Sequence, residues 1–186
     1  MSEQTNKLMI MNKSVSILVA EDDPKDVFLF KRAFSNTGIQ LPVIFLSNGE
    51  EVIDYLKGSP PFDDREVNPW PALIILDLTM PRVSGFEVLE WMGKHNLLNE
   101  IPVLAFSGVQ NPIEISRAYA LGAKFFLIKT VDASKWVNVL HRVVEMYGLS
   151  KDARAALATA DLEFSLVHPD PSPMFPNQVA QRKYPQ

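Results

Sequence analysis

The 186-residue chain contains no cysteine, which excludes disulfide bonds, zinc sites with thiolate ligands and thiol catalysis. Lys and Arg form no basic run and the formal net charge is −4, so binding to the phosphate backbone of nucleic acid is not expected. No apolar run in the sequence reaches the roughly 18 residues that a membrane-spanning helix needs. We therefore expect a cytoplasmic protein that contacts neither nucleic acid nor a membrane.

Two further kinds of site are missing from the sequence. The three histidines, His95, His141 and His168, are scattered without the spacing of metal ligands. There is also no glycine-rich loop of the kind that surrounds a nucleotide phosphate. A histidine-ligated metal enzyme and a kinase are therefore both unexpected.

The composition, with 47% hydrophobic and 22% charged residues, is typical of a globular protein. The length suits one domain of about 130 to 150 residues and a tail. We divide the chain into an N-terminal extension (1–13), a domain (14–148) and a C-terminal tail (149–186). The tail is predicted to be partly disordered because residues 169–186 hold five of the 14 prolines, although 153–164 has the composition of a short helix.

Five short apolar runs, each followed by a helical pattern, determine the expected fold. The runs cover residues 15–20, 42–46, 72–78, 102–106 and 124–128, and the helical patterns begin near residues 24, 49, 85, 112 and 133. Such apolar strands are typical of a parallel sheet with helices on both faces. We predict an α/β fold, a doubly wound five-stranded parallel sheet in the flavodoxin-like order 2-1-3-4-5. Residues 58–71, with four prolines, are predicted to form a long, specialised loop.

Two neighbouring strands of this sheet end in acidic residues. Glu21 and Asp22 follow the first apolar run, and Asp77 lies at the end of the third. The carboxyl ends of strands 1 and 3 flank the ligand-binding point of such a sheet, and carboxylates this close repel one another unless a cation lies among them. Mg²⁺ fits this donor set best, with Mn²⁺ as the alternative. Considered separately, Glu21 and Asp22 could belong to a solvated helix N-terminus capped by Asp23, and Asp77 could start a turn.

Two further strands end at the same edge in groups that suit a phosphoryl group. Ser107 ends the fourth strand and Lys129 the fifth, which adds a hydroxyl donor and an ammonium. Each has a simpler interpretation, Ser107 as a turn residue and Lys129 as an edge charge whose stem packs on apolar surface. The coincidence of acid, acid, hydroxyl and ammonium at four strand ends favours a phosphoryl-binding site.

The segments that carry these residues resemble a known family. VAEDDP (19–24), LIILDLTMPRVSG (73–85), FSG (106–108) and FFLIK (125–129) look like the signature segments of the response-regulator receiver domain of two-component signalling. The spacing is similar too, with 30 residues from Asp77 to Ser107 and 22 from Ser107 to Lys129. The resemblance covers roughly residues 14–148. It implies a phosphoacceptor that catalyses only its own Mg²⁺-dependent phosphorylation and dephosphorylation.

The resemblance also implies a role for each residue of the site. Asp77 would accept a phosphoryl group from a histidine kinase, and Lys129 would bind its oxygens. The metal would be bound by Asp22, by Asp77 and by the backbone carbonyl of Thr79, while Glu21 would assist through water.

Two more residues match the part of the family pattern that reports phosphorylation. Ser107 corresponds to the switch hydroxyl and Phe126 to the switch aromatic, which is expected to turn inward when the hydroxyl moves toward the phosphoryl group. The family more often has Thr and Tyr there, and both substitutions should still permit switching. Thr130 follows Lys129 where the family usually has proline, which leaves the geometry of that loop open.

The long loop and the lack of a recognisable output domain look most like the small regulators that partner phytochrome-type histidine kinases. The tail has no helix-turn-helix pattern, so the output is expected to be a protein contact or onward phosphotransfer; a homodimer is left open. An aspartyl-phosphate hydrolase would carry a second acid where Thr79 stands, and an unphosphorylated scaffold would lack the acids or the lysine. Neither alternative fits as well.

Overall fold

The computed structural model describes residues 15–35, 39, 41–108, 111–129, 136, 138–140 and 142–143. Five parallel strands form one sheet in the order β2-β1-β3-β4-β5, which confirms the predicted fold. The strands are β1 (Ser16–Ala20), β2 (Val43–Leu46), β3 (Pro71–Asp77), β4 (Val103–Ser107) and β5 (Phe125–Ile128). The helices are α2 (Pro24–Ser35), α3 (Gly49–Lys57), α4 (Gly85–Lys94) and α5 (Pro112–Ala120), with a short 3₁₀ turn at Leu97–Asn99.

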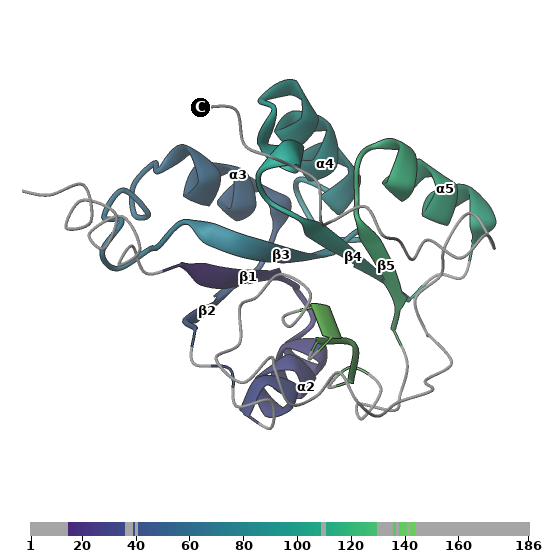
Figure 1. Cartoon of the computed structure of the whole chain (residues 1–186), viewed down its shortest axis with the longest axis horizontal. Coiled ribbons are helices and arrows are strands. Elements are labelled where there is room, and N and C mark those ends of the chain that lie inside the picture. The colour runs from purple at the N-terminus through teal and green to yellow at the C-terminus, as the bar shows by residue number, and fades with distance from the viewer. Residues whose placement is uncertain are drawn as a thin grey trace, which may run out of the picture.

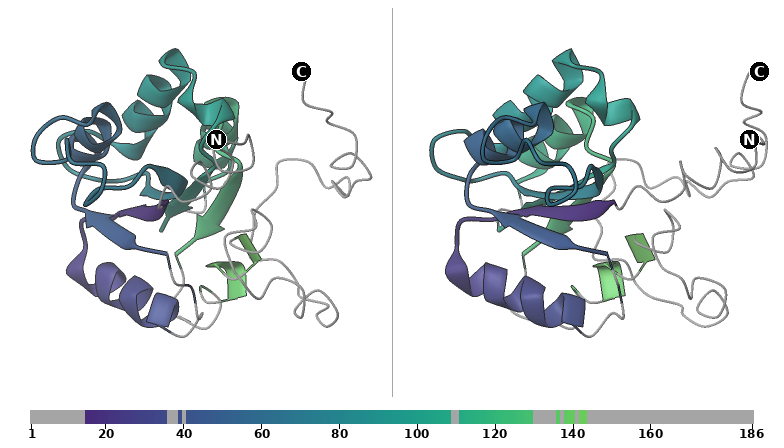
Figure 2. Two further views of the ribbon diagram at one scale, coloured as in Figure 1. Left: turned by 60° about the vertical axis from the view of Figure 1, so that its left-hand side comes forward. Right: turned by 90° about the vertical axis from the view of Figure 1, so that its left-hand side faces the viewer.

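Helices cover both faces of the sheet. Figure 1 shows α3, α4 and α5 on one face and α2 on the other, together with the bright green helical residues 136, 138–140 and 142–143. Figure 2 shows the sheet between these two layers. The apolar strand residues divide between two cores, one under each layer. This explains why every residue of β1 and β4 is buried, since parallel strands enclosed by crossover helices have no solvated face.

Short polar side chains fix where the helices begin. Asp23 Oδ1 accepts a hydrogen bond from the Lys25 N–H at 2.8 Å, so the predicted cap of α2 is present. Ser84 precedes α4 and forms a reciprocal capping box with Glu87, which satisfies two backbone donors that the first helical turn leaves free. These caps place each helix start directly after the strand end that precedes it.

The predicted loop before β3 packs against its own neighbours. The Tyr55 hydroxyl donates to the Pro69 carbonyl at 2.6 Å, and Arg65 donates to the Tyr55 carbonyl at 2.8 Å. The Arg65 guanidinium also lies 5.1 Å from the centre of the Trp70 ring. A cation near an aromatic face is an additional attraction, and together these contacts hold the loop against the end of α3.

Several sequence predictions fall outside the described residues. They concern the N-terminal extension, the whole tail with its short helix at 153–164, and the peptide after Lys129. The last predicted helix, 133–147, is described only in part, and Trp136, Val139, Leu140 and Val143 are buried as predicted. Within the described ranges, no helix is both long and apolar enough to cross a membrane.

Candidate functional site

The register of the central strands brings the predicted acids together. Ala20 of β1 pairs with Leu76 of β3, so the next residues along each strand direction, Glu21 and Asp77, meet at the carboxyl edge. Asp22 follows directly, at the start of the turn into α2. The sequence prediction that these three acids converge is therefore confirmed in geometry.

The three carboxylates form a compact donor group. One oxygen from each of Glu21, Asp22 and Asp77 lies within 4.8 Å of the others. Glu21 is 2% exposed and Asp77 is 3% exposed, whereas Asp22 is exposed to solvent. Hard divalent cations prefer carboxylate oxygens and retain several waters. The donor set therefore fits the predicted Mg²⁺ or Mn²⁺, with Asp22 on the side open to water.

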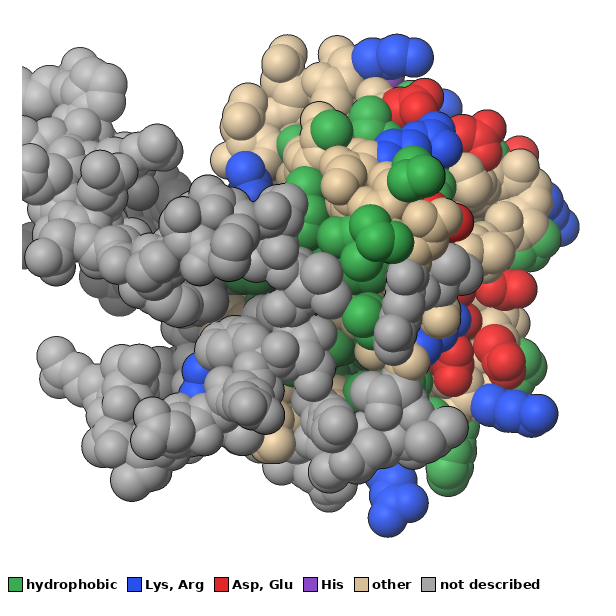
Figure 3. Space-filling view, turned by 90° about the vertical axis from the view of Figure 1, so that its right-hand side faces the viewer, with side chains coloured by type: hydrophobic (Ala, Val, Ile, Leu, Met, Phe, Trp, Pro, Cys, Tyr) green, Lys and Arg blue, Asp and Glu red, His purple; other side chains and the backbone are tan. Residues whose placement is uncertain are grey.

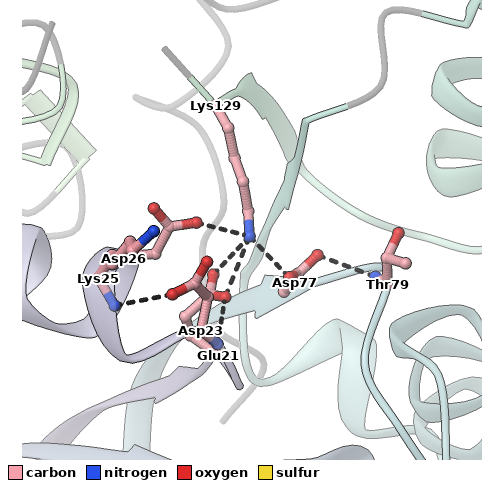
Figure 4. A network of polar contacts seen from close by, with 7 residues as sticks. All are labelled: Glu21, Asp23, Lys25, Asp26, Asp77, Thr79 and Lys129. Carbon is pink, nitrogen blue, oxygen red and sulfur yellow. Dashed lines mark hydrogen bonds and ion pairs between the residues drawn. The ribbon is translucent and has the colours of Figure 1, made fainter. Parts of the chain in front are cut away.

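Lys129 contacts three carboxylates, two of which belong to this donor group (Figure 4). Its Nζ is 2.8 Å from Asp77 Oδ2, and it is 3.0 Å and 2.8 Å from the two Glu21 oxygens. A third carboxylate, Asp26 of α2, places its Oδ2 2.9 Å from the same nitrogen. The lysine thus connects the ends of β1, β3 and β5 with the first turn of α2.

One ammonium does not neutralise the acids around it, and the local charge stays negative. Burial raises the pKa of Glu21 to about 7, and the nearby Asp77 charge adds to this, while the hydrogen bond from Lys129 opposes it. Burial alone would lower the pKa of Lys129, but its hydrogen bonds to the three carboxylates outweigh burial and raise that pKa. The lysine is therefore charged at neutral pH, and the site attracts a further cation or a proton.

This imbalance predicts that burial of the Glu21 carboxylate lowers the free energy of unfolding in a pH-dependent way. Its pKa rises from 4.5 in the unfolded chain to about 7 in the folded protein. The folded state is therefore most stable below about pH 4.5, where Glu21 is protonated in both states, and it loses stability as the pH rises through the folded-state pKa. Glu21→Gln removes this titration. In metal-free buffer, the free energy of unfolding of the wild type should therefore fall relative to the variant by roughly 2–3 kcal/mol between about pH 5 and about pH 8.

Urea denaturation of both proteins in the presence of a chelator at a series of pH values measures this difference. Glu50→Gln is the matched control, because Glu50 is an exposed acid whose partner Arg82 lies at the surface. The control should follow the wild-type curve. If the free energy of unfolding had the same pH dependence in wild type and Glu21→Gln, burial would not raise the pKa of the Glu21 carboxylate.

Both oxygens of Asp77 are oriented by hydrogen bonds. The Thr79 backbone N–H donates to Oδ1 at 2.8 Å, while Oδ2 accepts from Lys129 (Figure 4). The Leu78 N–H in turn donates to the Phe106 carbonyl at 3.1 Å, which ties the turn after β3 to the neighbouring strand. Thr79 thus lies beside the Asp77 carboxylate, and metal binding by its backbone carbonyl stays a prediction.

Ser107 reaches the same edge through the pairing of β4 with β5. The Lys129 N–H donates to the Ser107 carbonyl at 2.8 Å, and Ser107 pairs with Ile128 in the strand register. Ser107 is fully buried. The backbones of Ser107 and Lys129, predicted from separate strands, are therefore neighbours.

Phe126 occupies the interior of the protein. Its ring is fully buried in the core under α3, α4 and α5. Tyr119 of α5 hydrogen bonds to the Phe126 backbone, and burial raises the pKa of that tyrosine to about 12. The sequence predicts that Phe126 turns inward during switching. The ring already has the inward position here, so the movement itself stays a prediction.

Sequence reasoning missed Asp26. Asp26 lies in the first turn of the helix that begins directly after the acidic strand end, which is the one signal for it. The pattern of strand ends does not select Asp26, because it lies inside a helical pattern. Only the position of α2 against the sheet reveals its contact with Lys129.

Comparison with known proteins identifies the family. Residues 17–141 match the family model of the response regulator receiver domain. The two-component response regulator ORR3 of Oryza sativa is 37% identical over 128 residues, which cover 69% of this chain and 89% of ORR3.

Solved structures give the same result and include proteins of light signalling. Response regulator RPA3017 in red light signaling of R. palustris is 29% identical with a TM-score of 0.67, over 78% of this chain and 99% of that one. The phosphorylated cyanobacterial phytochrome response regulator RcpA is 26% identical with a TM-score of 0.64, over 72% and 93%. The Mn²⁺-bound form of response regulator Rcp1 is 26% identical with a TM-score of 0.63, over 74% and 96%.

Proposed function

Because this chain belongs to the response-regulator receiver family, we propose that it accepts a phosphoryl group from a histidine kinase on Asp77. One observation carries the proposal. Asp77 ends the central strand, nearly buried, with Lys129 Nζ 2.8 Å from Oδ2 and with the Glu21 and Asp22 oxygens within 4.8 Å. A carboxylate held this way is a nucleophile beside an ammonium that can stabilise the charge of an incoming phosphoryl group.

The chemistry needs little covalent machinery. An Asp77 oxygen forms a bond to the phosphorus of a phosphohistidine while the P–N bond breaks, and the imidazole leaves with that electron pair. Lys129 stabilises the negative charge on the phosphoryl oxygens. A divalent cation held by Asp22, Asp77, the Thr79 carbonyl and, through water, Glu21 would supply further charge neutralisation. The existence of a Mn²⁺-bound form of the similar Rcp1 supports binding of a divalent cation.

The output is a change in protein contacts or an onward phosphotransfer. The phosphoryl group offers new acceptors that draw the Ser107 hydroxyl toward Asp77, and the Phe126 ring then turns into the space that the hydroxyl leaves. Phe126 packs in the core beneath α5, so a shift there alters the surface of α5 and β5. That surface is the proposed site of partner recognition.

The proposed kinase partner is of the phytochrome type. Support comes from the printed descriptions of RcpA, a phytochrome response regulator, and RPA3017, which acts in red light signalling. Mixing the protein with a phosphorylated phytochrome-type kinase and with an unrelated histidine kinase tests this choice. Faster transfer from the phytochrome-type kinase is expected, and equal rates would contradict it.

One face of the described part of the chain shows mixed charge. In Figure 3, the coloured Lys and Arg side chains lie next to Asp and Glu side chains, and the described residues form no basic patch on that face. A cytoplasmic location and the division into extension, domain and tail remain predictions from the sequence.

Phosphoryl uptake tests the central proposal. Incubation with acetyl phosphate and Mg²⁺ should add the mass of one phosphoryl group, and Asp77→Asn should abolish the addition because the amide is not a nucleophile. Asp54→Asn is the matched control, since Asp54 lies on α3 away from the strand ends, and it should be phosphorylated like the wild type. Phosphate addition that persists in Asp77→Asn would refute the assignment.

A further inference from the structure

Asp26 is a carboxylate of the site for which the phosphoryl-acceptor mechanism has no use. It lies in the first turn of α2, with its Oδ2 2.9 Å from Lys129 Nζ. The two side chains are 20% and 19% exposed, so the contact is shielded from water and not an ordinary surface ion pair. Figure 4 shows Asp26 on the helix side of the lysine, opposite Asp77.

The hydrogen-bonding capacity of Lys129 is fully used. An ammonium has three N–H donors, and three carboxylates contact it, from Glu21, Asp26 and Asp77. Glu21 and Asp77 also belong to the compact carboxylate group that suits a cation, whereas Asp26 does not. Glu21 and Asp77 can therefore contact a cation as well as Lys129, whereas Asp26 contacts only the lysine among these groups.

We propose that Asp26 is a positioning residue that shares the Lys129 ammonium with Asp77 and thereby slows phosphoryl uptake at Asp77. The inference rests on the proposed function of Asp77. An incoming phosphoryl group needs the positive charge of the lysine, and Asp26 shares that charge as a competing anion. Its own negative charge also opposes the approach of an anionic donor.

Three variants test this role through charge. Asp26→Asn keeps the size of the side chain and removes its charge, and should raise the rate of uptake from acetyl phosphate about fivefold. Asp26→Glu keeps the charge and should stay within about twofold of wild type. Glu90→Gln removes one charge from an exposed ion pair with Arg117 on another helix and should leave the rate unchanged.

A second donor separates a charge effect from a structural one. Acetyl phosphate is a dianion at neutral pH, whereas phosphoramidate carries less negative charge, so Asp26→Asn should gain more with acetyl phosphate than with phosphoramidate. A merely structural defect would change both rates equally. Thermal melting of each variant checks that the fold is retained.

The outcomes distinguish the inference from the function on which it rests. Three results together support the proposed role of Asp26. They are faster uptake by Asp26→Asn with a larger gain for acetyl phosphate, near-normal uptake by Asp26→Glu, and unchanged uptake by Glu90→Gln. An unchanged or slower Asp26→Asn, or an equal gain in Glu90→Gln, overturns it while leaving Asp77 as the acceptor. Absence of Asp77-dependent uptake in the wild type would instead remove the proposed function.

Discussion

Replacement of Gly85 by alanine should lower the free energy of unfolding by roughly 2–4 kcal/mol, because the new methyl group would overlap backbone atoms. A Cβ at this position would lie 2.2 Å from the Asp77 carbonyl oxygen and 2.8 Å from the Leu78 Cα. Neither atom belongs to a flexible side chain. Relief therefore requires movement of the end of β3, which carries the proposed phosphoryl acceptor.

The same helix provides a matched control. Gly93, near the end of α4, has 3.5 Å between an added Cβ and the Leu98 Cδ1 atom, which is ordinary van der Waals contact. Gly93→Ala should leave stability unchanged or raise it by up to about 1 kcal/mol, because alanine loses less backbone entropy in a helix.

Urea unfolding curves of the two variants measure this contrast. Gly85→Ala that still folds should also take up phosphoryl groups more slowly, since the Asp77 backbone has shifted. Equal stability of Gly85→Ala and Gly93→Ala would mean that the turn after β3 can relax without cost.

Replacement of Lys129 by methionine should lower the free energy of unfolding by roughly 3–5 kcal/mol at neutral pH in metal-free buffer. Methionine retains much of the stem but leaves the buried Glu21 and Asp77 carboxylates facing each other without an ammonium. The folded-state pKa of Glu21 would then rise further above its unfolded value. Stability should therefore recover as the pH falls, because protons replace the missing cation.

Lys31→Met is the control for loss of one lysine. Lys31 lies on α2, and its Nζ contacts the Phe45 ring face at 5.1 Å, so the change should stay within about 0.5 kcal/mol. Adding Glu21→Gln to Lys129→Met should restore part of the stability, since one of the facing charges is removed. If Lys129→Met were as stable as Lys31→Met at neutral pH, water would be sufficient to screen the repulsion between the Glu21 and Asp77 carboxylates.

Much of the fold could be predicted from the sequence because its signals are local. A strand buried on both faces must be a continuous apolar run, as in residues 73–76, and the chain must turn polar where the strand leaves the sheet. The predicted sheet order then placed Glu21, Asp77, Ser107 and Lys129 on one edge. That edge follows from topology alone, since carboxyl ends of parallel strands lie together.

The contacts made at that edge could not be predicted, because they depend on how separate elements pack. The attachment of Asp26 to Lys129 requires the angle at which α2 lies against the sheet, and the inward Phe126 ring requires the space under α5. The sequence by itself determined which strand-end groups gather at the site, through the ends of the strands and their order. Only the tertiary structure decided which carboxylates share the lysine, because side-chain distances between elements far apart in the chain are determined by packing and register.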